Sequence, residues 1–172
     1  MLGFENKRYR EMAKKKAKMG FEEKAFKAKY GNQPVTAVVD GKRIEFRSKL
    51  EYRWAQHLDF YKTCGIIKDW FYEFHTFRFE GREKPPTEYT PDFLVRNNDN
   101  TFEYFETKGL LQKFDIDKLK IMNERRPYVK ITYVFWISPK ISVQKKMKLE
   151  RYCHRIIWDA RSILEKEPID MV

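Results

Sequence analysis

Two strand-like segments of this 172-residue chain carry charged side chains where an apolar core has no use for them. Asp92 stands in front of the apolar run 93–95, and Glu106 and Lys108 lie at the end of a second β-prone run. Because side chains alternate along a strand, Glu106 and Lys108 share one face, and Glu103 is expected to face solvent on the opposite side. The pattern predicts a polar site at the edge of a sheet.

The residue types at this site suit a magnesium ion. Mg²⁺ takes oxygen ligands and keeps several waters, so two carboxylates and one backbone carbonyl are a sufficient anchor. Asp92, Glu106 and the carbonyl of Thr107 are predicted to supply that set, with Mn²⁺ expected to substitute. The ion would activate water and neutralise phosphate in an in-line displacement, and Lys108 is placed to orient the water or stabilise the developing charge. Glu51, one turn into a predicted helix, is the candidate ligand for a second metal ion or for a water bound to the first ion.

Each of these residues also has an ordinary structural reading. Pro91-Asp92 is a common turn pair, and Glu51 stands three residues after Ser48, as a helix capping box requires. A glutamate and a lysine two residues apart on a strand usually belong to solvated cross-strand pairs. The combination, in this order, is what favours a nuclease over these separate readings.

The segments Pro91-Asp92 and Glu106-Thr107-Lys108 form a Pro-Asp…(Asp/Glu)-x-Lys signature, in which the chain resembles the PD-(D/E)XK nuclease superfamily. With "YTPDFLV", "FEYFETKGLL", a "SKLE" helix upstream and an "ITYVF" strand downstream, residues 46–135 are most similar to the phage endonuclease I family of Holliday junction resolvases. The resemblance implies a restriction-endonuclease-like core and a two-fold homodimer that hydrolyses branched DNA to 5′-phosphate and 3′-hydroxyl ends. The catalytic positions that it implies are Glu51, Asp92, Glu106 and Lys108.

Other activities stay open beside this one. The stretch "VDGKRIEFRSKLEYRW" also resembles uncharacterised phage nucleases and the endonuclease subunit of Tn7-like transposases. A transposase-type or linear-duplex endonuclease is therefore the rival within the same enzyme class. A non-catalytic, basic DNA-binding protein that retains the fold is the rival from another class.

The charge of the chain indicates a polyanionic partner. Thirty-six Lys and Arg against 25 Asp and Glu give a net charge of +11, which favours nucleic acid. Residues 1–30 hold ten basic and four acidic side chains, so a basic helical arm, 1–34 with its linker, is expected to precede a nuclease domain at 35–172. Phosphate contacts are predicted for Lys113, Lys118, Lys120, Arg125, Arg126, Lys145, Lys146 and Lys148.

The sequence pattern also predicts the elements that must position the site. Asp40-Gly41 favours a tight hairpin between 35–39 and 42–46, whose edges could pair two subunits, and Ser48 begins a helix that should end near Cys64-Gly65. Further on we expect an extended segment at 66–80, a polar loop at 81–86 and two strands at 89–95 and 101–108. A helix at 115–125, a central strand at 129–137 and a helical tail at 142–163 should follow, and a strand at 156–158 could break the tail.

This order of elements predicts an α/β fold with a mixed central β-sheet flanked by helices. No apolar run reaches the roughly 20 residues of a membrane span, so no membrane partner is expected. The two cysteines are too few for a secreted disulfide framework. We therefore expect a cytoplasmic protein, in the host cytoplasm if it is phage-encoded.

Overall fold

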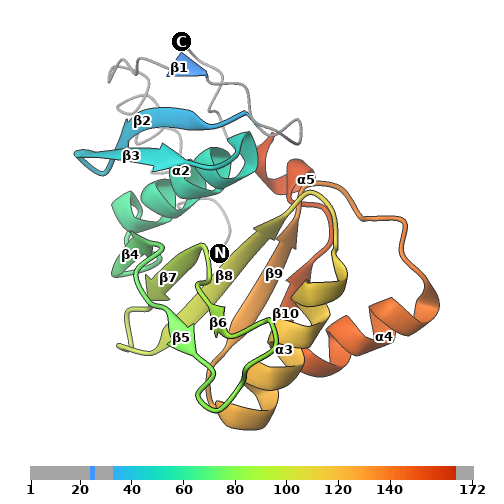
Figure 1. Cartoon of the computed structure of the whole chain (residues 1–172). Helices are drawn as coiled ribbons and strands as arrows, with labels where there is room; N and C mark the ends of the chain where they lie inside the picture. Colours follow the sequence, from blue (N-terminus) through green and yellow to red (C-terminus); the bar gives the residue numbers. More distant parts are fainter. Residues whose placement is uncertain (1–23, 26–32, 166–172) are drawn as a thin grey trace, which may run out of the picture. The chain divides into compact units, whose positions relative to one another are not determined.

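The computed structural model describes residues 24–25 and 33–165, and the chain divides into two compact units. Unit 1 comprises Met1–Ile67 with Arg161–Val172, and unit 2 comprises Lys68–Ala160 (Figure 1). The predicted basic arm lies outside the described residues except at β1, Lys24–Ala25, which is a strand paired antiparallel with β2 (Val35–Val39). The helix expected from composition is wrong at these two residues, because pairing with a strand edge overrides helix propensity.

Unit 1 contains the predicted hairpin and helix. Strands β2 and β3 (Lys42–Phe46) pair in register around Asp40 and Gly41, both with positive φ, as a primed two-residue turn requires. Helix α2 (Lys49–Thr63) begins after Ser48, whose side chain accepts the Glu51 N–H, and ends at Cys64. A short helix, α5 (Arg161–Leu164), completes the unit. Both sequence predictions are confirmed.

Unit 2 is built on a mixed five-stranded sheet in the order β10-β9-β8-β7-β4. The pairs β8–β9 and β9–β10 are parallel, whereas β4–β7 and β7–β8 are antiparallel. The strands are β4 Asp69–Tyr72, β7 Phe93–Arg96, β8 Phe102–Lys108, β9 Ile131–Phe135 and β10 Arg155–Ile157. The predicted α/β class with a mixed central sheet is confirmed, and the expected break of the tail by a strand is β10.

Two predicted extended segments are interrupted. The segment expected at 89–95 divides into β6 (Glu88–Tyr89) and β7, because Pro91 has no N–H for a strand ladder. The segment expected at 66–80 divides into β4 and β5 (Phe77–Arg78), and Glu73, just after β4, has a left-handed φ of 45°. Strands β5 and β6 form a separate two-stranded ribbon.

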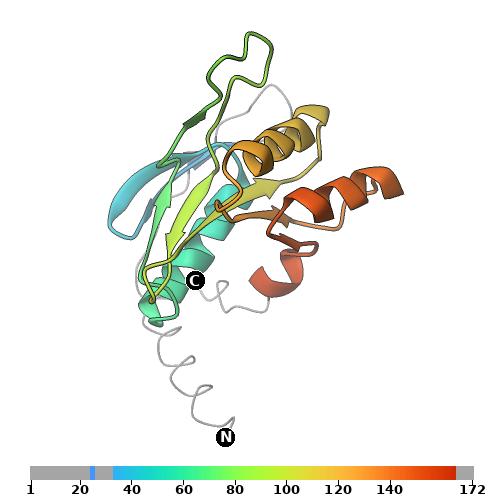
Figure 2. The same ribbon diagram turned by 90° about the horizontal axis from the view of Figure 1, so that it is seen from below.

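Two helices cover one face of the five-stranded sheet in unit 2 (Figure 2). They are α3 (Lys113–Arg125) and α4 (Val143–Tyr152), and α3 begins two residues before the predicted start. Leu119 and Met122 of α3 and Leu149 of α4 pack in one buried cluster with Tyr133 and Phe135 of β9. Burying this apolar surface is the main stabilising term for the sheet and both helices.

The register decides which charged side chains lie under these helices. Glu106 pairs with Tyr133 and Lys108 pairs with Phe135 along the parallel β8–β9 ladder, so both share the helix-covered face. The alternation predicted from sequence is therefore confirmed. None of the helices among residues 33–165 is long and apolar enough to cross a membrane.

Candidate active site

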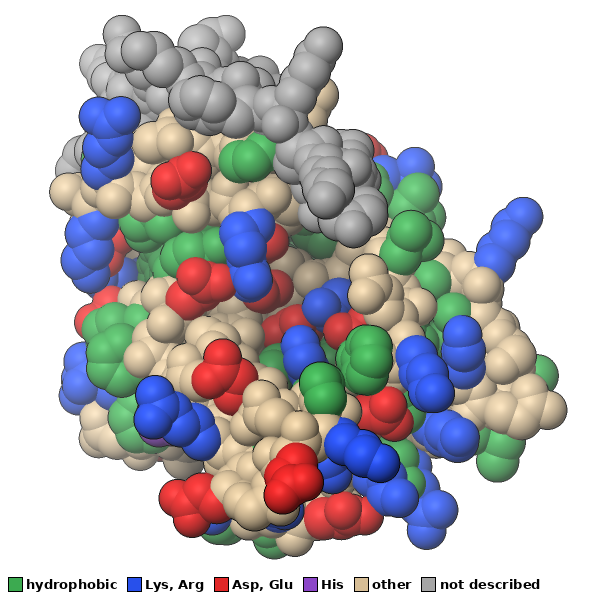
Figure 3. Space-filling view, viewed as in Figure 1, with side chains coloured by type: hydrophobic (Ala, Val, Ile, Leu, Met, Phe, Trp, Pro, Cys, Tyr) green, Lys and Arg blue, Asp and Glu red, His purple; other side chains and the backbone are tan. Residues whose placement is uncertain are grey.

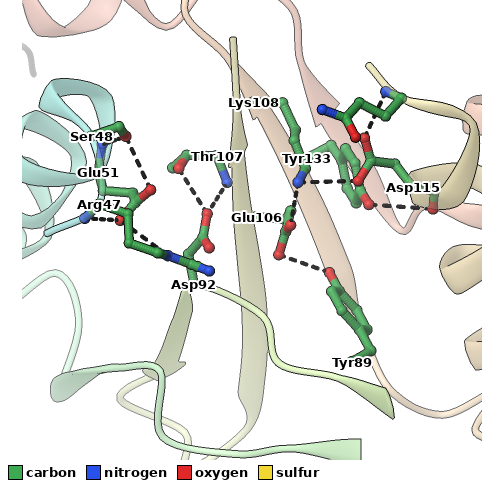
Figure 4. Close-up of polar contacts among 11 residues, drawn as sticks. Arg47, Ser48, Glu51, Tyr89, Asp92, Glu106, Thr107, Lys108, Asp115 and Tyr133 are labelled. Atoms are coloured by element: carbon green, nitrogen blue, oxygen red, sulfur yellow. Dashed lines mark hydrogen bonds and ion pairs between the residues drawn. The ribbon is translucent and has the colours of Figure 1, made fainter. Parts of the chain in front are cut away.

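Asp92 is the residue immediately before β7 of the five-stranded sheet, and it follows β6 of the separate two-stranded ribbon. The antiparallel register that pairs Phe93 with Phe105 places Asp92 beside Glu106 when it is continued by one residue. Its Oδ2 accepts hydrogen bonds from the Thr107 backbone N–H (2.7 Å) and from the Thr107 hydroxyl (2.8 Å) (Figure 4). The side chain is 3% exposed, so Asp92 is a buried carboxylate at the end of a strand ladder.

Glu106 is the second buried carboxylate of the site and is also 3% exposed. Its Oε1 lies 2.7 Å from the Lys108 Nζ, and its Oε2 accepts a 3.1 Å hydrogen bond from the Tyr89 hydroxyl. Burial and the negative charge of Asp92 raise the pKa of Glu106 to about 7, against the opposing effect of the Lys108 ammonium. Two like charges are therefore crowded at one end of β8.

Lys108 is held between two carboxylates. Besides Glu106, its Nζ lies 3.1 Å from Oδ1 of Asp115, a residue in the first turn of α3. Burial lowers the pKa of Lys108, but the charges of Glu106 and Asp115 outweigh it, and the net pKa is raised. The lysine is therefore a fixed ammonium group rather than a proton donor near neutral pH.

Two buried tyrosines and one lysine complete the surroundings of Glu106. Burial and the charge of Glu106 raise the pKa of both Tyr89 and Tyr133 well above the usual value, so both hydroxyls stay protonated. The Lys118 Nζ lies over the Tyr89 ring, 5.4 Å from its centroid. Tyr89 is thus fixed as a hydrogen-bond donor to Glu106.

Glu51 belongs to unit 1, where it accepts two hydrogen bonds at the start of α2 and lies 3.9 Å from Nε of Arg47. Its Oε2 accepts the Arg47 N–H at 2.9 Å, and its Oε1 accepts the Ser48 hydroxyl at 3.0 Å. The carboxylate therefore accepts hydrogen bonds at the start of α2, one of them from the N–H of the residue before the Ser48 cap. The second-metal role of Glu51 stays a prediction.

Glu103, expected to face solvent, is not exposed. Its side chain is only 14% exposed, and its Oε1 accepts hydrogen bonds from the Thr132 hydroxyl and from Arg155 Nη2 (3.1 Å). Thr132 pairs with Phe105 across the β8–β9 ladder, and Arg155 belongs to β10. The prediction was wrong because the position of β10 decides the burial of this face, and strand alternation alone does not reveal that position.

The donor set suits a hard divalent cation. Asp92 and Glu106 offer buried carboxylate oxygens whose mutual repulsion a cation would relieve. Since Thr107 directs its N–H to Asp92, its carbonyl points to the same side of β8. Among the described residues no group of three or more His, Cys, Asp or Glu side chains could hold a metal. The Thr107 carbonyl as a third ligand stays a prediction.

The cations predicted to bind phosphate lie on α3 and α4, except Arg126, which is the residue after α3. Figure 3 shows Lys and Arg side chains on the side of the molecule that carries these helices. Lys118 differs from the others because it is only partly exposed and lies beside Tyr89. Arg125 donates to the Glu80 carbonyl at 2.8 Å. The exposed cations are Lys113, Lys120, Arg125, Arg126, Lys145, Lys146 and Lys148.

Sequence reasoning missed the roles of Asp115, Tyr89 and Tyr133. Asp115 stands three residues after Gln112, whose backbone N–H it accepts at 2.7 Å, so a capping pattern marked its helical position without marking its contact with Lys108. Tyr89 and Tyr133 lie in β-prone runs that predict core residues. Only the register and the position of α3 bring the three residues to one place.

Comparison with known proteins places the chain in a family. No curated protein matches it. Residues 27–143 match the family model described as "Protein of unknown function (DUF1064)", and this range includes Asp92, Glu106, Lys108 and Asp115. Because the match spans more than half of the 172 residues, the chain belongs to the DUF1064 family.

Proposed function

We propose that this protein is a Mg²⁺-dependent DNA endonuclease that hydrolyses phosphodiester bonds, with branched DNA as its preferred substrate. The observation that carries the proposal is the pair of buried carboxylates, Asp92 and Glu106, with the Lys108 ammonium 2.7 Å from Glu106. A core that served only stability would gain little from crowding two carboxylates, because each loses hydration on burial. Perturbed, crowded titratable groups are typical of functional sites.

Each residue of the site has a distinct task in this proposal. Asp92, Glu106 and the Thr107 carbonyl would hold Mg²⁺, which supplies charge neutralisation for the phosphate and activation of water. The Thr107 N–H and hydroxyl fix Asp92 Oδ2, so that carboxylate is oriented before any ligand arrives. The Tyr89 hydroxyl fixes Glu106 in the same way.

Lys108 would stabilise the negative charge that develops on the phosphate oxygens. In the hydrolysis, the oxygen of water bonds to phosphorus as the bond from phosphorus to the 3′ oxygen breaks. The leaving 3′ oxygen takes up a proton and the phosphate remains on the 5′ end, as the resemblance to the junction resolvases implies. The Lys108 side chain is 21% exposed, and its ammonium lies between two buried carboxylates, those of Glu106 and Asp115.

DNA binding would come from the exposed cations of α3 and α4. Phosphate contacts position a protein without reading sequence, which suits recognition of DNA by shape. Symmetric cleavage of a four-way junction requires two active sites, so we infer a two-fold homodimer. In unit 1, β3 is the edge strand of its sheet, while β1 covers part of the other edge of the hairpin, and β3 is the edge that could pair two subunits.

The proposal is tested with purified protein and matched four-way, flap and linear DNAs, with Mg²⁺ and with EDTA. We expect cleavage only with Mg²⁺, faster on the branched DNAs, and a loss of on the order of a thousandfold in Asp92→Ala. Glu124→Ala is the control, because Glu124 is an exposed residue of α3 whose carboxylate lies 3.8 Å from the exposed Lys120 ammonium. Cleavage by Asp92→Ala at the parental rate would exclude this site.

One observation favours a second candidate, a non-catalytic DNA-binding protein. Both oxygens of Glu106 already have partners, Lys108 and Tyr89, so a metal must compete with an ion pair. A protein of this second kind would bind branched DNA in EDTA and in Mg²⁺ alike and cleave none of the substrates. The same assay therefore distinguishes the two functions.

A further inference from the structure

Asp115 uses its two carboxylate oxygens for two different purposes. Oδ2 accepts the Gln112 backbone N–H at 2.7 Å, at the start of α3, and Oδ1 lies 3.1 Å from the Lys108 Nζ. Its side chain is 7% exposed, and Figure 4 shows the Lys108 ammonium between Glu106 and Asp115. The helix start and the end of β8 are therefore joined through one buried carboxylate.

The helix cap does not account for the contact with Lys108. An amide oxygen could also accept the Gln112 N–H, although less strongly than a carboxylate, because capping needs an acceptor and not a full charge. A buried ammonium, in contrast, needs negative charge close by, since desolvation is costly for an unpaired ion. The carboxylate of Asp115 therefore supplies negative charge that stabilises the Lys108 ammonium.

We infer that Asp115 is a positioning residue for Lys108. The inference rests on the proposed function, in which Glu106 turns its charge toward a bound cation. Lys108 then depends on Asp115 to stay in place, because a lysine side chain has four rotatable bonds and loses conformational entropy when it is fixed. Asp115 thus keeps the ammonium beside the reacting phosphate while the other carboxylate serves the metal.

The test uses Asp115→Asn, which keeps an acceptor for the Gln112 N–H and removes the charge. Asp117→Asn is the matched control, with the same change two residues further along α3 on a partly exposed side chain. In Asp115→Asn we expect kcat on junction DNA to fall about ten- to a hundredfold for each folded molecule, with KM for DNA nearly unchanged. Asp117→Asn should keep the parental kcat.

A second measurement reports on Lys108 without metal or DNA. Acetic anhydride labels lysine amines in proportion to their availability, and mass spectrometry gives the extent at each lysine. We expect Lys108 to be labelled several-fold faster in Asp115→Asn than in the parent, relative to other lysines of the same chain, and not faster in Asp117→Asn. This readout separates positioning of Lys108 from a general loss of structure.

Three outcomes decide the matter. Parental kcat together with parental labelling of Lys108 in Asp115→Asn would overturn the inference. A fall in kcat that follows the loss of folded protein, without faster labelling of Lys108, would overturn it as well and leave a capping role. If the parent cleaves no DNA, the proposed function fails, and the labelling experiment alone then decides whether Asp115 holds Lys108.

Discussion

Glu103 and Glu106 lie three residues apart on β8 and face opposite sides of the sheet, and both are largely buried beside a cation. Glu103 accepts from one neutral hydroxyl, that of Thr132, and from Arg155. Glu106 has an equivalent pair of partners, Tyr89 and Lys108, but it also lies against Asp92. The excess of negative charge, and not burial or ion pairing, is what separates a candidate functional carboxylate from a structural one.

The largest expected difference between the two glutamates is in cleavage. Glu106→Gln should reduce Mg²⁺-dependent cleavage by on the order of a thousandfold, because the amide cannot replace a carboxylate as a metal ligand. Glu103→Gln should stay within about twofold of the parent for each folded molecule. Single-turnover rates on junction DNA measure both, and equal losses in the two variants would remove the functional distinction.

The second difference is in the pH dependence of stability. Because the pKa of Glu106 is raised to about 7 in the folded state, the folded protein holds this proton more tightly than the unfolded chain. Its contribution to stability is complete below about pH 4.5 and is lost as the pH rises to about 7. Relative to Glu106→Gln, the parent should lose roughly 3 kcal/mol of unfolding free energy between pH 4.5 and 7.5.

Urea unfolding of both proteins in EDTA, at closely spaced pH values, measures this difference. Titrating groups away from Glu106 are shared by the two proteins, so they cancel when the two curves are subtracted. A difference that does not vary with pH would show that the pKa of Glu106 is not raised in the folded protein.

A smaller effect is expected on the other side of the sheet. Glu103→Ala leaves Thr132 and Arg155 without their acceptor and should lower the unfolding free energy by about 1–3 kcal/mol. Denaturant midpoints at pH 7 measure this loss. An unfolding free energy equal to that of the parent would indicate that Glu103 faces solvent, as strand alternation suggested.

The smallest effects concern the cations. Arg155 forms an ion pair with Glu103. Lys145 is an exposed residue of α4, and it is its backbone N–H that donates to the Ser142 hydroxyl at the start of this helix. Lys145→Gln should flatten the plot of log affinity against log salt by about 0.9, the effect of one phosphate contact, and Arg155→Gln should leave the slope unchanged. Filter binding to junction DNA in EDTA at several salt concentrations gives both slopes, and equal slopes would mean that Lys145 does not contact DNA.

Much of the fold was predictable because it depends on local rules. Asp40-Gly41 fixed the hairpin through its turn geometry, and Ser48 fixed the start of α2 through its cap. Strand alternation placed Glu106 and Lys108 on one face without any tertiary information. The break of the strand at Pro91 was also readable, since proline lacks the N–H that a ladder needs, but the surrounding β-prone residues concealed it.

What could not be predicted depends on where distant elements come to lie. Asp115 reaches Lys108 only because α3 packs over β8, and Glu103 is covered only because β10 adds to the sheet beyond β9. Neither contact leaves a periodic signal in the chain. Non-local packing, rather than residue type, gave these two carboxylates their surroundings.

The hydrogen bond from the Thr107 backbone N–H to Asp92 gives the site its own spectroscopic signal. This amide donates to a side chain rather than to a backbone carbonyl, at 2.7 Å, in a buried position. Its proton chemical shift and its exchange with deuterium therefore depend on the charge and position of one carboxylate. A single cross-peak in a nitrogen–proton spectrum thus reports on the position of the Asp92 carboxylate when a divalent cation or DNA is added.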